Sequence, residues 1–293
     1  NNNRLLIAFM WSWSKLSAAK WEDAWNERIS GNPNAVIESF KGGKSIRITV
    51  YCETEDDAIT LKNYFGGSIR EIKTTDWVAS QARAKRPDLK IRANLVITEQ
   101  VEAKELAKLV RQYPKRAILS IPAEMAFGTG DHATTSTCLR AISDFAKEHK
   151  TSPWTITDIG CGTAVLAIAA IALGAEHATA FDFDPIAVDV SRTNAERNHI
   201  SEQKLEIFQA DVFEWVPTPS QQGDIVVANL FSTILQKAFP RIICAMNPGS
   251  SLVISGILTS QWDETCETAN KNGLVFDKVI TKGKWTTAQG RLV

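Results

Sequence analysis

The sequence contains no apolar run long enough to span a membrane and no pair of cysteines at a metal-binding spacing. A transmembrane helix needs about 20 consecutive apolar residues, and the longest runs, Leu5–Trp13 and Ala164–Leu173, reach only about half of that length. The five cysteines form no CxxC motif and the four histidines are scattered, which argues against a disulfide framework and against a zinc site. We therefore expect free thiols in the cytoplasm, no bound metal and no membrane partner.

An excess of charge of one sign is also lacking, but the balance is uneven along the chain. The 33 lysines and arginines equal the 33 aspartates and glutamates. Residues 1–116 carry 20 basic against 14 acidic side chains, whereas residues 117–293 carry 13 against 19. Proteins that bind nucleic acid over a whole domain are usually basic, so direct nucleic-acid binding is not expected. The hydrophobic share of 44% is typical of a globular protein, and the length suggests about two domains.

The first 75 residues carry a mixed pattern of strands and helices. A turn rich in lysine and glycine, Lys41–Lys44, separates two strand-like segments and predicts a hairpin. The expected elements are, in order, Leu5–Trp13 (strand), Leu16–Ile29 (helix), Val36–Phe40 (strand), Ile46–Tyr51 (strand), Glu55–Tyr64 (helix) and Ile69–Lys73 (strand). The order βαββαβ predicts a small α+β domain of the ferredoxin-like class over residues 1–75.

Residues 76–125 are interpreted as a connecting region between two domains. Its charged residues are mostly basic, and Asp88 alone opposes a run formed by Arg83, Lys85, Arg86, Lys90 and Arg92. Such a run is either a solvated face or a contact with an acidic partner surface.

From about residue 126 strands and helices alternate, which predicts a doubly wound, mostly parallel sheet over residues 126–293. The seven expected strands are Thr155–Ile159, Ala178–Asp182, Leu205–Ala210, Asp224–Asn229, Leu252–Ile257, Val275–Thr281 and Thr286–Leu292. The last two form an antiparallel hairpin, because parallel neighbours need a long crossover. The predicted fold class is therefore α/β, a Rossmann-like sheet of seven strands preceded by the small α+β domain.

A glycine turn follows the first of these strands. Gly160 and Gly162 let the backbone approach a ligand at the strand end. Ala164 stands where the dinucleotide fingerprint has its third glycine, which disfavours a pyrophosphate. Asp158, just before the glycines, would repel a pyrophosphate but would tolerate a sulfonium and an ammonium group.

Acidic residues follow the second and third strands. Asp182 lies 20 residues after Gly162, where a carboxylate can accept hydrogen bonds from both hydroxyls of a ribose. The alternative is a helix cap, but Asp184, directly before Pro185, suits that role better. Phe183 is a candidate for the face of an adenine. Asp211 is either part of the ligand crevice or an ordinary loop residue.

Two further segments are expected at the same edge of the sheet. Asn229 ends the fourth strand, and its amide can hold either the cofactor or an incoming amine, although a structural turn is the usual alternative. The loop Ala126–Thr135 is rich in glycine and threonine, so that it either covers a ligand or only leads into a helix capped by Thr134 or Thr135.

Together these segments resemble the PrmA family, the methyltransferases that modify ribosomal protein L11. The family's motifs and their matches here are AFGTGxHxTT at Ala126–Thr135, DxGCGxGxLAIAA at Asp158–Ala170, D-x-DP-x-A at Asp182–Ala187, VVANL at Val226–Leu230 and SGIL at Ser255–Leu258. The resemblance spans residues 126–293, and Ala164 departs from the pattern because it replaces the family's glycine.

This resemblance implies a class I methyltransferase with S-adenosylmethionine as its cofactor. It implies cofactor contacts at Thr135, Gly160, Asp182 and Asn229, and the surrounding motif residues Phe127, Gly128, Asp158, Gly162, Phe183 and Asp211 complete the expected binding site. It also implies that the N-terminal domain recruits a ribosomal protein partner of the L11 type, and that lysine side chains or the N-terminal amine are methylated. No general base is assigned, and His132 is either near the acceptor or a partner in a loop hydrogen bond.

Three other functions compete with this interpretation. A methyltransferase of the same fold can act on another protein, on a nucleic acid or on a small molecule. A nicotinamide-dependent oxidoreductase would explain the glycine turn and Asp182, but not Ala164 or the AFGTG segment. A ribosome-binding protein without catalysis would retain the fold, but retention of all four implied cofactor contacts argues against it.

Overall fold

The computed structural model of the protein divides into two compact units, residues 1–86 and residues 87–293, and each is described by itself. The structure describes residues 11–22, 25, 28–29, 34–39, 44–52, 54–71, 87–122 and 133–293. All five cysteines lie in these ranges and are free thiols. No helix within these ranges is both long and apolar enough to cross a membrane.

The first unit contains a four-stranded antiparallel sheet in the order β2-β3-β1-β4. Its elements are β1 (Trp11–Ala18), a 3-10 turn η1 (Ala19–Trp21), β2 (Ala35–Ser39), β3 (Ser45–Cys52), α2 (Glu55–Phe65) and β4 (Ser68–Glu71). The helix α2 begins at Thr54, whose hydroxyl oxygen accepts a hydrogen bond from the Asp57 backbone N–H at 3.2 Å, as a helix cap does.

Apolar side chains of β1 and β3 form the core of this unit. Trp13, Ile46 and Ile48 are fully buried and pack with Trp25 and Phe65. The expected helix start at Leu16 is wrong, because β1 stays paired with β3 as far as Ala18. The pairing along the whole strand therefore overrides the helical spacing of the local sequence. The assignment to the ferredoxin-like class stays a prediction.

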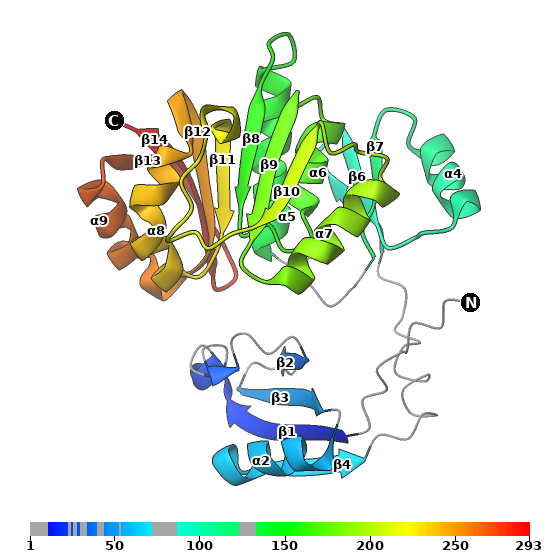
Figure 1. The fold of residues 1–293 in the computed structure, drawn as a ribbon, viewed down its shortest axis with the longest axis vertical. Helices are drawn as coiled ribbons and strands as arrows, with labels where there is room; N and C mark the ends of the chain where they lie inside the picture. Colours follow the sequence, from blue (N-terminus) through cyan, green and yellow to red (C-terminus); the bar gives the residue numbers. More distant parts are fainter. Residues whose placement is uncertain are drawn as a thin grey trace. The chain divides into compact units, whose positions relative to one another are not determined.

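The second unit is built on a seven-stranded sheet in the order β10-β9-β8-β11-β12-β14-β13 (Figure 1). Its strands are β8 (Thr155–Ile159), β9 (His177–Asp182), β10 (Leu205–Gln209), β11 (Gly223–Asn229), β12 (Met246–Leu258), β13 (Leu274–Lys282) and β14 (Trp285–Leu292). Neighbours among the first five strands are parallel, and β14 is antiparallel to β12 and β13. This order confirms the predicted α/β class and the terminal hairpin.

Helices cover both faces of this sheet (Figure 1). They are α5 (Ala133–Glu148), α6 (Val165–Ala172), α7 (Pro185–Arg197), α8 (Ser232–Cys244) and α9 (Trp262–Lys271), with 3-10 turns η2 (Pro219–Gln221) and η3 (Thr259–Gln261). Residues of α5, α6 and α7 share one buried cluster with Ile225 and Val227, whereas residues of α8 and α9 share another with Val226 and Ala228. The alternation of buried residues along β11 thus separates two cores, as it must in a strand covered on both sides.

Residues 87–122 also belong to the second unit. They form a small sheet of β5 (Leu89–Ile91), β6 (Leu95–Thr98) and β7 (Ala117–Ser120), together with α4 (Ala103–Gln112). Ile91, Leu95 and Leu119 are buried in the same cluster as α5 and α6. The structure therefore places most of the expected connecting region, residues 87–122, in the second unit.

Candidate functional site

The strand order turns at β8, because β9 and β10 extend the sheet on one side of it and β11 and β12 on the other. Ligands of open α/β sheets bind at such a point, outside the carboxyl ends of the strands. Ile159, Asp182, Gln209 and Asn229 are the last residues of β8, β9, β10 and β11. The structure therefore brings the expected polar residues of separate strands to one edge.

Asp182 connects the end of β9 to the glycine turn after β8. Its Oδ2 accepts a hydrogen bond from the Gly162 N–H at 2.9 Å, and its Oδ1 accepts one from the Asp184 N–H at 3.0 Å. Asp184 itself caps α7, since its Oδ1 accepts from the Ile186 N–H at 2.9 Å. The helix cap is thus Asp184, as expected, and the Asp182 carboxylate is held at the mouth of the turn.

Alternate residues of the glycine turn have left-handed backbone conformations. Gly160, Gly162 and Ala164 have φ values of 70°, 56° and 57°. The N–H groups of Gly160 and Cys161 both donate to the Phe181 carbonyl at 2.9 Å, which ties the turn to β9. A Cβ on Gly160 would lie 2.4 Å from Leu230 Cδ2. The left-handed φ and the Leu230 side chain therefore both favour glycine at position 160.

Replacing Gly160 by alanine is expected to lower the free energy of unfolding by about 2–3 kcal/mol, because the added Cβ suffers both the left-handed φ and the contact with Leu230. Gly283→Ala is the matched control, since its φ is 62° and no atom lies within 4 Å of the added Cβ. The control should lose only about 1 kcal/mol. Denaturant unfolding measures both variants, and equal losses would show that Leu230 does not confine the turn.

Asp158 is a buried carboxyl group beneath this turn, with 1% of its surface exposed. Its Oδ2 accepts a hydrogen bond from the Ala167 N–H at 3.2 Å, whereas its Oδ1 has no partner among the described residues. Burial raises the pKa of Asp158 to about 7; the Ala167 N–H opposes this shift and the nearby Asp182 charge adds to it. The site therefore holds a carboxyl group that a neighbouring cation would ionise.

Asn229 is joined to the first turn of α5. Its Nδ2 donates to Thr135 Oγ1 at 3.4 Å, and Thr135 is buried. The Asn229 Oδ1 is buried and has no hydrogen-bond partner among the described residues. An acceptor left without a donor costs about 1–3 kcal/mol. Together with Asp158 Oδ1, it leaves two acceptor oxygens that suit a ligand carrying N–H donors and positive charge.

The remaining expected site residues make local contacts or lie outside the described part of the chain. Phe183 exposes 69% of its surface directly after β9, and its carbonyl accepts from Gln209 Nε2 at 3.0 Å. Asp211 uses its Oδ1 to accept from the Phe213 N–H at 2.9 Å, so one of its oxygens serves a local turn. Phe127, Gly128 and His132 lie outside the described residues.

Leu230 and Gly256 are site residues that the sequence reasoning missed. Gly256 has a φ of 84°, at a shift in the pairing of β12 with β14, and a Cβ there would lie 2.5 Å from the Leu230 carbonyl oxygen. Leu230 therefore lies between two close glycines, Gly160 and Gly256, and this fixes the backbone that follows Asn229. A glycine inside a strand pattern, as at Gly256, is a sequence signal for such a close approach of another backbone segment.

The strand order, the glycine turn after β8 and the polar ends of β9 and β11 define a class I methyltransferase fold. The family model described as "Ribosomal protein L11 methyltransferase (PrmA)" matches residues 13–292. The chain belongs to this family, which confirms the resemblance found in the motifs. The expected cofactor, S-adenosylmethionine, is the one that this membership implies.

Individual relatives with the same description are similar to this chain over part of their length. A "Ribosomal protein L11 methyltransferase" of Hahella chejuensis is 37% identical over 178 residues, which cover 61% of this chain and 57% of the relative. One of Enterobacter sp. is 40% identical over 171 residues, 57% of this chain and 54% of the relative. The matched region thus spans a little more than half the length of these relatives.

A solved structure shares the fold. The crystal structure of a ribosomal protein L11 methylase from Lactobacillus delbrueckii subsp. bulgaricus has a TM-score of 0.57 and 21% sequence identity. The similarity covers 71% of this chain and 99% of that chain. It shows that the chain shares its fold with that structure over the covered part.

Proposed function

We propose that this protein transfers methyl groups from S-adenosylmethionine to amino groups of ribosomal protein L11, on lysine side chains or the N-terminal amine. The observation that carries the proposal is the family match over residues 13–292, because it extends through both units. The first unit then recruits the protein substrate, with the domain limits 1–75, 76–125 and 126–293 as the sequence draws them. The free thiols fit a cytoplasmic enzyme.

The cofactor would lie along the carboxyl edge of the sheet. Asp182 suits the ribose hydroxyls, and Gly160 and Gly162 let the backbone approach the ligand. The unpaired oxygens of Asp158 and Asn229 suit the ammonium and sulfonium groups of S-adenosylmethionine, which are both positively charged.

Five further residues would complete this cofactor site. Phe183 and Asp211 are assigned to the adenine end, and Thr135 to the hydroxyl partner of Asn229. Phe127 and Gly128 belong to the segment that precedes α5 in the sequence, and we assign this segment to covering the cofactor.

The cofactor supplies a methyl group on a positively charged sulfur, which already makes the leaving group good. The chain then has to align the acceptor and exclude water. A free lysine amine has a pKa of about 10.4 and is mostly protonated at neutral pH. A site that is buried and that already holds a cation lowers the pKa of that amine. We assign the Asn229 side chain, which donates to Thr135, either to the cofactor or to an N–H of the acceptor.

Purified protein incubated with methyl-labelled S-adenosylmethionine and purified ribosomal protein L11 is expected to label L11. Mass spectrometry of the digested product would then assign the methyl groups to lysine side chains or to the N-terminus. Omitting this protein, and replacing it by the Asp182→Asn variant, are the controls. With the cofactor held near the dissociation constant of the unmodified chain, both should leave L11 nearly unlabelled.

The same assay on a whole lysate separates this proposal from its alternative. Label on another protein, on nucleic acid or on a small molecule, with none on L11, would keep the methyltransferase class and remove the substrate. Absence of label in every fraction, together with no binding of S-adenosylmethionine, would contradict the enzymatic proposal as a whole.

A further inference from the structure

Two buried hydroxyl groups lie beside Asn229 in the larger sheet. Ser255 is the partner of Asn229 in the parallel register of β11 with β12, and its Oγ is 2.6 Å from Thr287 Oγ1 on β14. Ser255 and Thr287 expose 0% and 3% of their surface. Residues in register on neighbouring strands face the same side of a sheet. Both hydroxyls therefore lie on the side of the Asn229 side chain, which α5 covers.

Packing alone does not require hydroxyl groups at this place. The residues two positions earlier on the same strands, Val227 and Val253, are apolar and belong to the core under α5. A buried hydroxyl must be hydrogen-bonded to avoid a cost, whereas replacing both partners of such a bond by apolar groups of the same shape is nearly neutral. The Ser255–Thr287 bond therefore contributes little net stability, and what it adds is a fixed orientation.

The helix α5 contacts both Asn229 and Ser255. Thr135, in its first turn, accepts from Asn229 Nδ2 at 3.4 Å. Cys138 follows three residues later, on the same face of the helix, and its thiol interacts with the Ser255 hydroxyl. Burial raises the pKa of this thiol to about 12 although the Ser255 hydroxyl opposes the rise, so the thiol stays protonated. Two contacts one turn apart therefore join α5 to two neighbouring strands.

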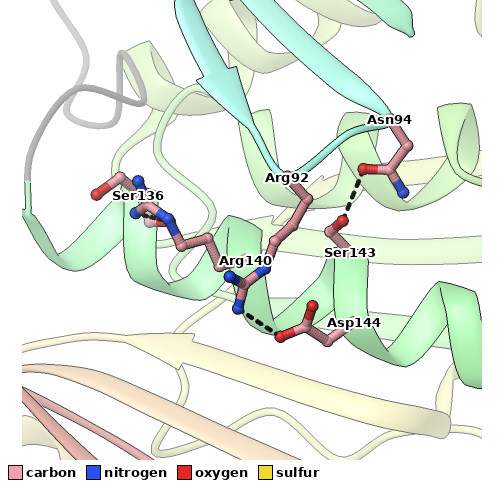
Figure 2. A network of polar contacts seen from close by, with 6 residues as sticks. All are labelled: Arg92, Asn94, Ser136, Arg140, Ser143 and Asp144. Atoms are coloured by element: carbon pink, nitrogen blue, oxygen red, sulfur yellow. Dashed lines mark hydrogen bonds and ion pairs between the residues drawn. The ribbon is translucent and has the colours of Figure 1, made fainter. Parts of the chain in front are cut away.

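The helix α5 is itself fixed at its second half (Figure 2). Ser143, which is buried on α5, donates its Oγ hydrogen to Asn94 Oδ1 at 2.7 Å. Arg92 Nη2 donates to Asp144 Oδ2 at 2.6 Å. Arg92 and Asn94 both lie in the turn between β5 and β6. These contacts oppose rotation and sliding of α5, so the residues of its first two turns keep their places over the sheet.

Ser255 also directly precedes the glycine that confines Leu230. Gly256 has a φ of 84°, and a Cβ there would lie 2.5 Å from the Leu230 carbonyl oxygen. The pairing of β12 with β14 shifts at this point, and the bond from Ser255 to Thr287 joins the two strands across the shift. The bond therefore holds the segment that lies against the backbone directly after Asn229.

We propose that Ser255 is a positioning residue for the Asn229 side chain, and that Thr287 and Cys138 hold the Ser255 hydroxyl in place. We call these three residues the buried polar network. It keeps the Asn229 amide in one orientation, with Nδ2 toward Thr135 and the unpaired Oδ1 left for a ligand. The inference rests on the proposed function, because Asn229 is assigned there to the cofactor or to the acceptor. Ser255 acts through Asn229 and not by contact with the reacting groups.

The first test observes Asn229 directly and needs no substrate. In protein isotope-labelled at the asparagine nitrogen atoms, the NMR signals of the Asn229 side-chain amide are assigned by their loss in Asn229→Ala. Thr287→Val removes the hydroxyl at similar shape and is expected to move these signals, whereas Thr287→Ser keeps the hydroxyl and should leave them in place. The matched control is Thr286→Val, which removes another buried hydroxyl, bonded to Thr259 Oγ1 at 3.4 Å, from the opposite face of β14.

The second test measures methyl transfer to L11. Thr287→Val and Ser255→Ala should each lower kcat/KM by about 10-fold, an effect of about 1.4 kcal/mol, which is within the range for one lost hydrogen bond. Thr287→Ser and the control Thr286→Val should leave kcat/KM nearly unchanged. Rescue by serine separates a role of the hydroxyl from a general loss of packing, which would affect both threonine positions.

Equal shifts of the Asn229 signals in both valine variants, or no shift in Thr287→Val, would overturn the proposal, since the network would then not fix the amide. Moved signals with an unchanged kcat/KM would also overturn it, because the orientation would not matter to methyl transfer. Failure of the unmodified chain to methylate L11 would contradict the proposed function. The NMR result alone would then decide whether Ser255 positions Asn229, so the two proposals fail separately.

Discussion

Replacing Asp182 by asparagine is expected to weaken the binding of S-adenosylmethionine by about 100-fold. Hydrogen bonds to a charged group are worth about 1.5–3 kcal/mol each, and in the proposed site the carboxylate accepts two from the ribose. The amide has one acceptor oxygen and no charge, so one hydrogen bond is lost and the other is weakened. Together these losses are about 3 kcal/mol, which corresponds to roughly 100-fold in the dissociation constant. Isothermal titration of the cofactor against both proteins measures the change.

Asp184→Asn provides the matched control for this result. It makes the same chemical change two residues away, at a carboxylate whose Oδ1 caps α7. Asparagine caps a helix about as well as aspartate does, so the control should retain both cofactor affinity and stability. An unchanged affinity in Asp182→Asn, or an equal loss in Asp184→Asn, would remove the ribose assignment.

The larger sheet could be predicted because its strands are buried on both faces. Such strands appear as short apolar runs, and helices with their own caps separate them, as Asp184 and Pro185 show at α7. The polar residues that end these runs, Asp182 and Asn229, then lie at one edge by the geometry of parallel strands. The edge where these polar residues meet was therefore accessible from sequence, and their contacts with the cofactor stay predictions.

The features that the sequence did not predict depend on contacts between distant segments. The continuation of β1 to Ala18 depends on its pairing with β3. The place of Leu230 between Gly160 and Gly256 depends on a backbone approach from β12. Ala164 illustrates the same limit, since it has a φ of 57° although alanine disfavours a left-handed conformation. The surrounding buried packing holds that backbone against the preference of alanine.

The buried carboxyl group of Asp158 is expected to make both stability and cofactor affinity depend on pH. Its folded-state pKa of about 7 lies above the ordinary value of 3.8. The folded chain therefore binds the proton more tightly than the unfolded chain does. The stability that this provides is complete below about pH 4 and is lost as the pH rises to about 7. A bound cation favours the ionised carboxylate, so cofactor binding should release a proton below pH 7.

The variant Asp158→Asn is expected to separate these two effects, because the amide has similar shape but does not titrate. Relative to the variant, the unmodified chain should lose about 2 kcal/mol of unfolding free energy between pH 5 and pH 7, because the slope of about 1.4 kcal/mol per pH unit falls as the pH approaches the pKa. Denaturant unfolding at several pH values measures this difference, in which the contributions of other groups cancel.

Cofactor affinity should change with pH in the opposite direction. In the unmodified chain it should fall by up to about 10-fold per pH unit below pH 7, whereas in Asp158→Asn it should be weak at every pH because the compensating charge is gone. A stability difference that does not vary with pH would mean that Asp158 is already ionised in the folded chain. The variant should thus be more stable above pH 7 and less able to bind the cofactor. That combination is expected where a buried charge lowers the stability of the fold and raises its affinity for a ligand.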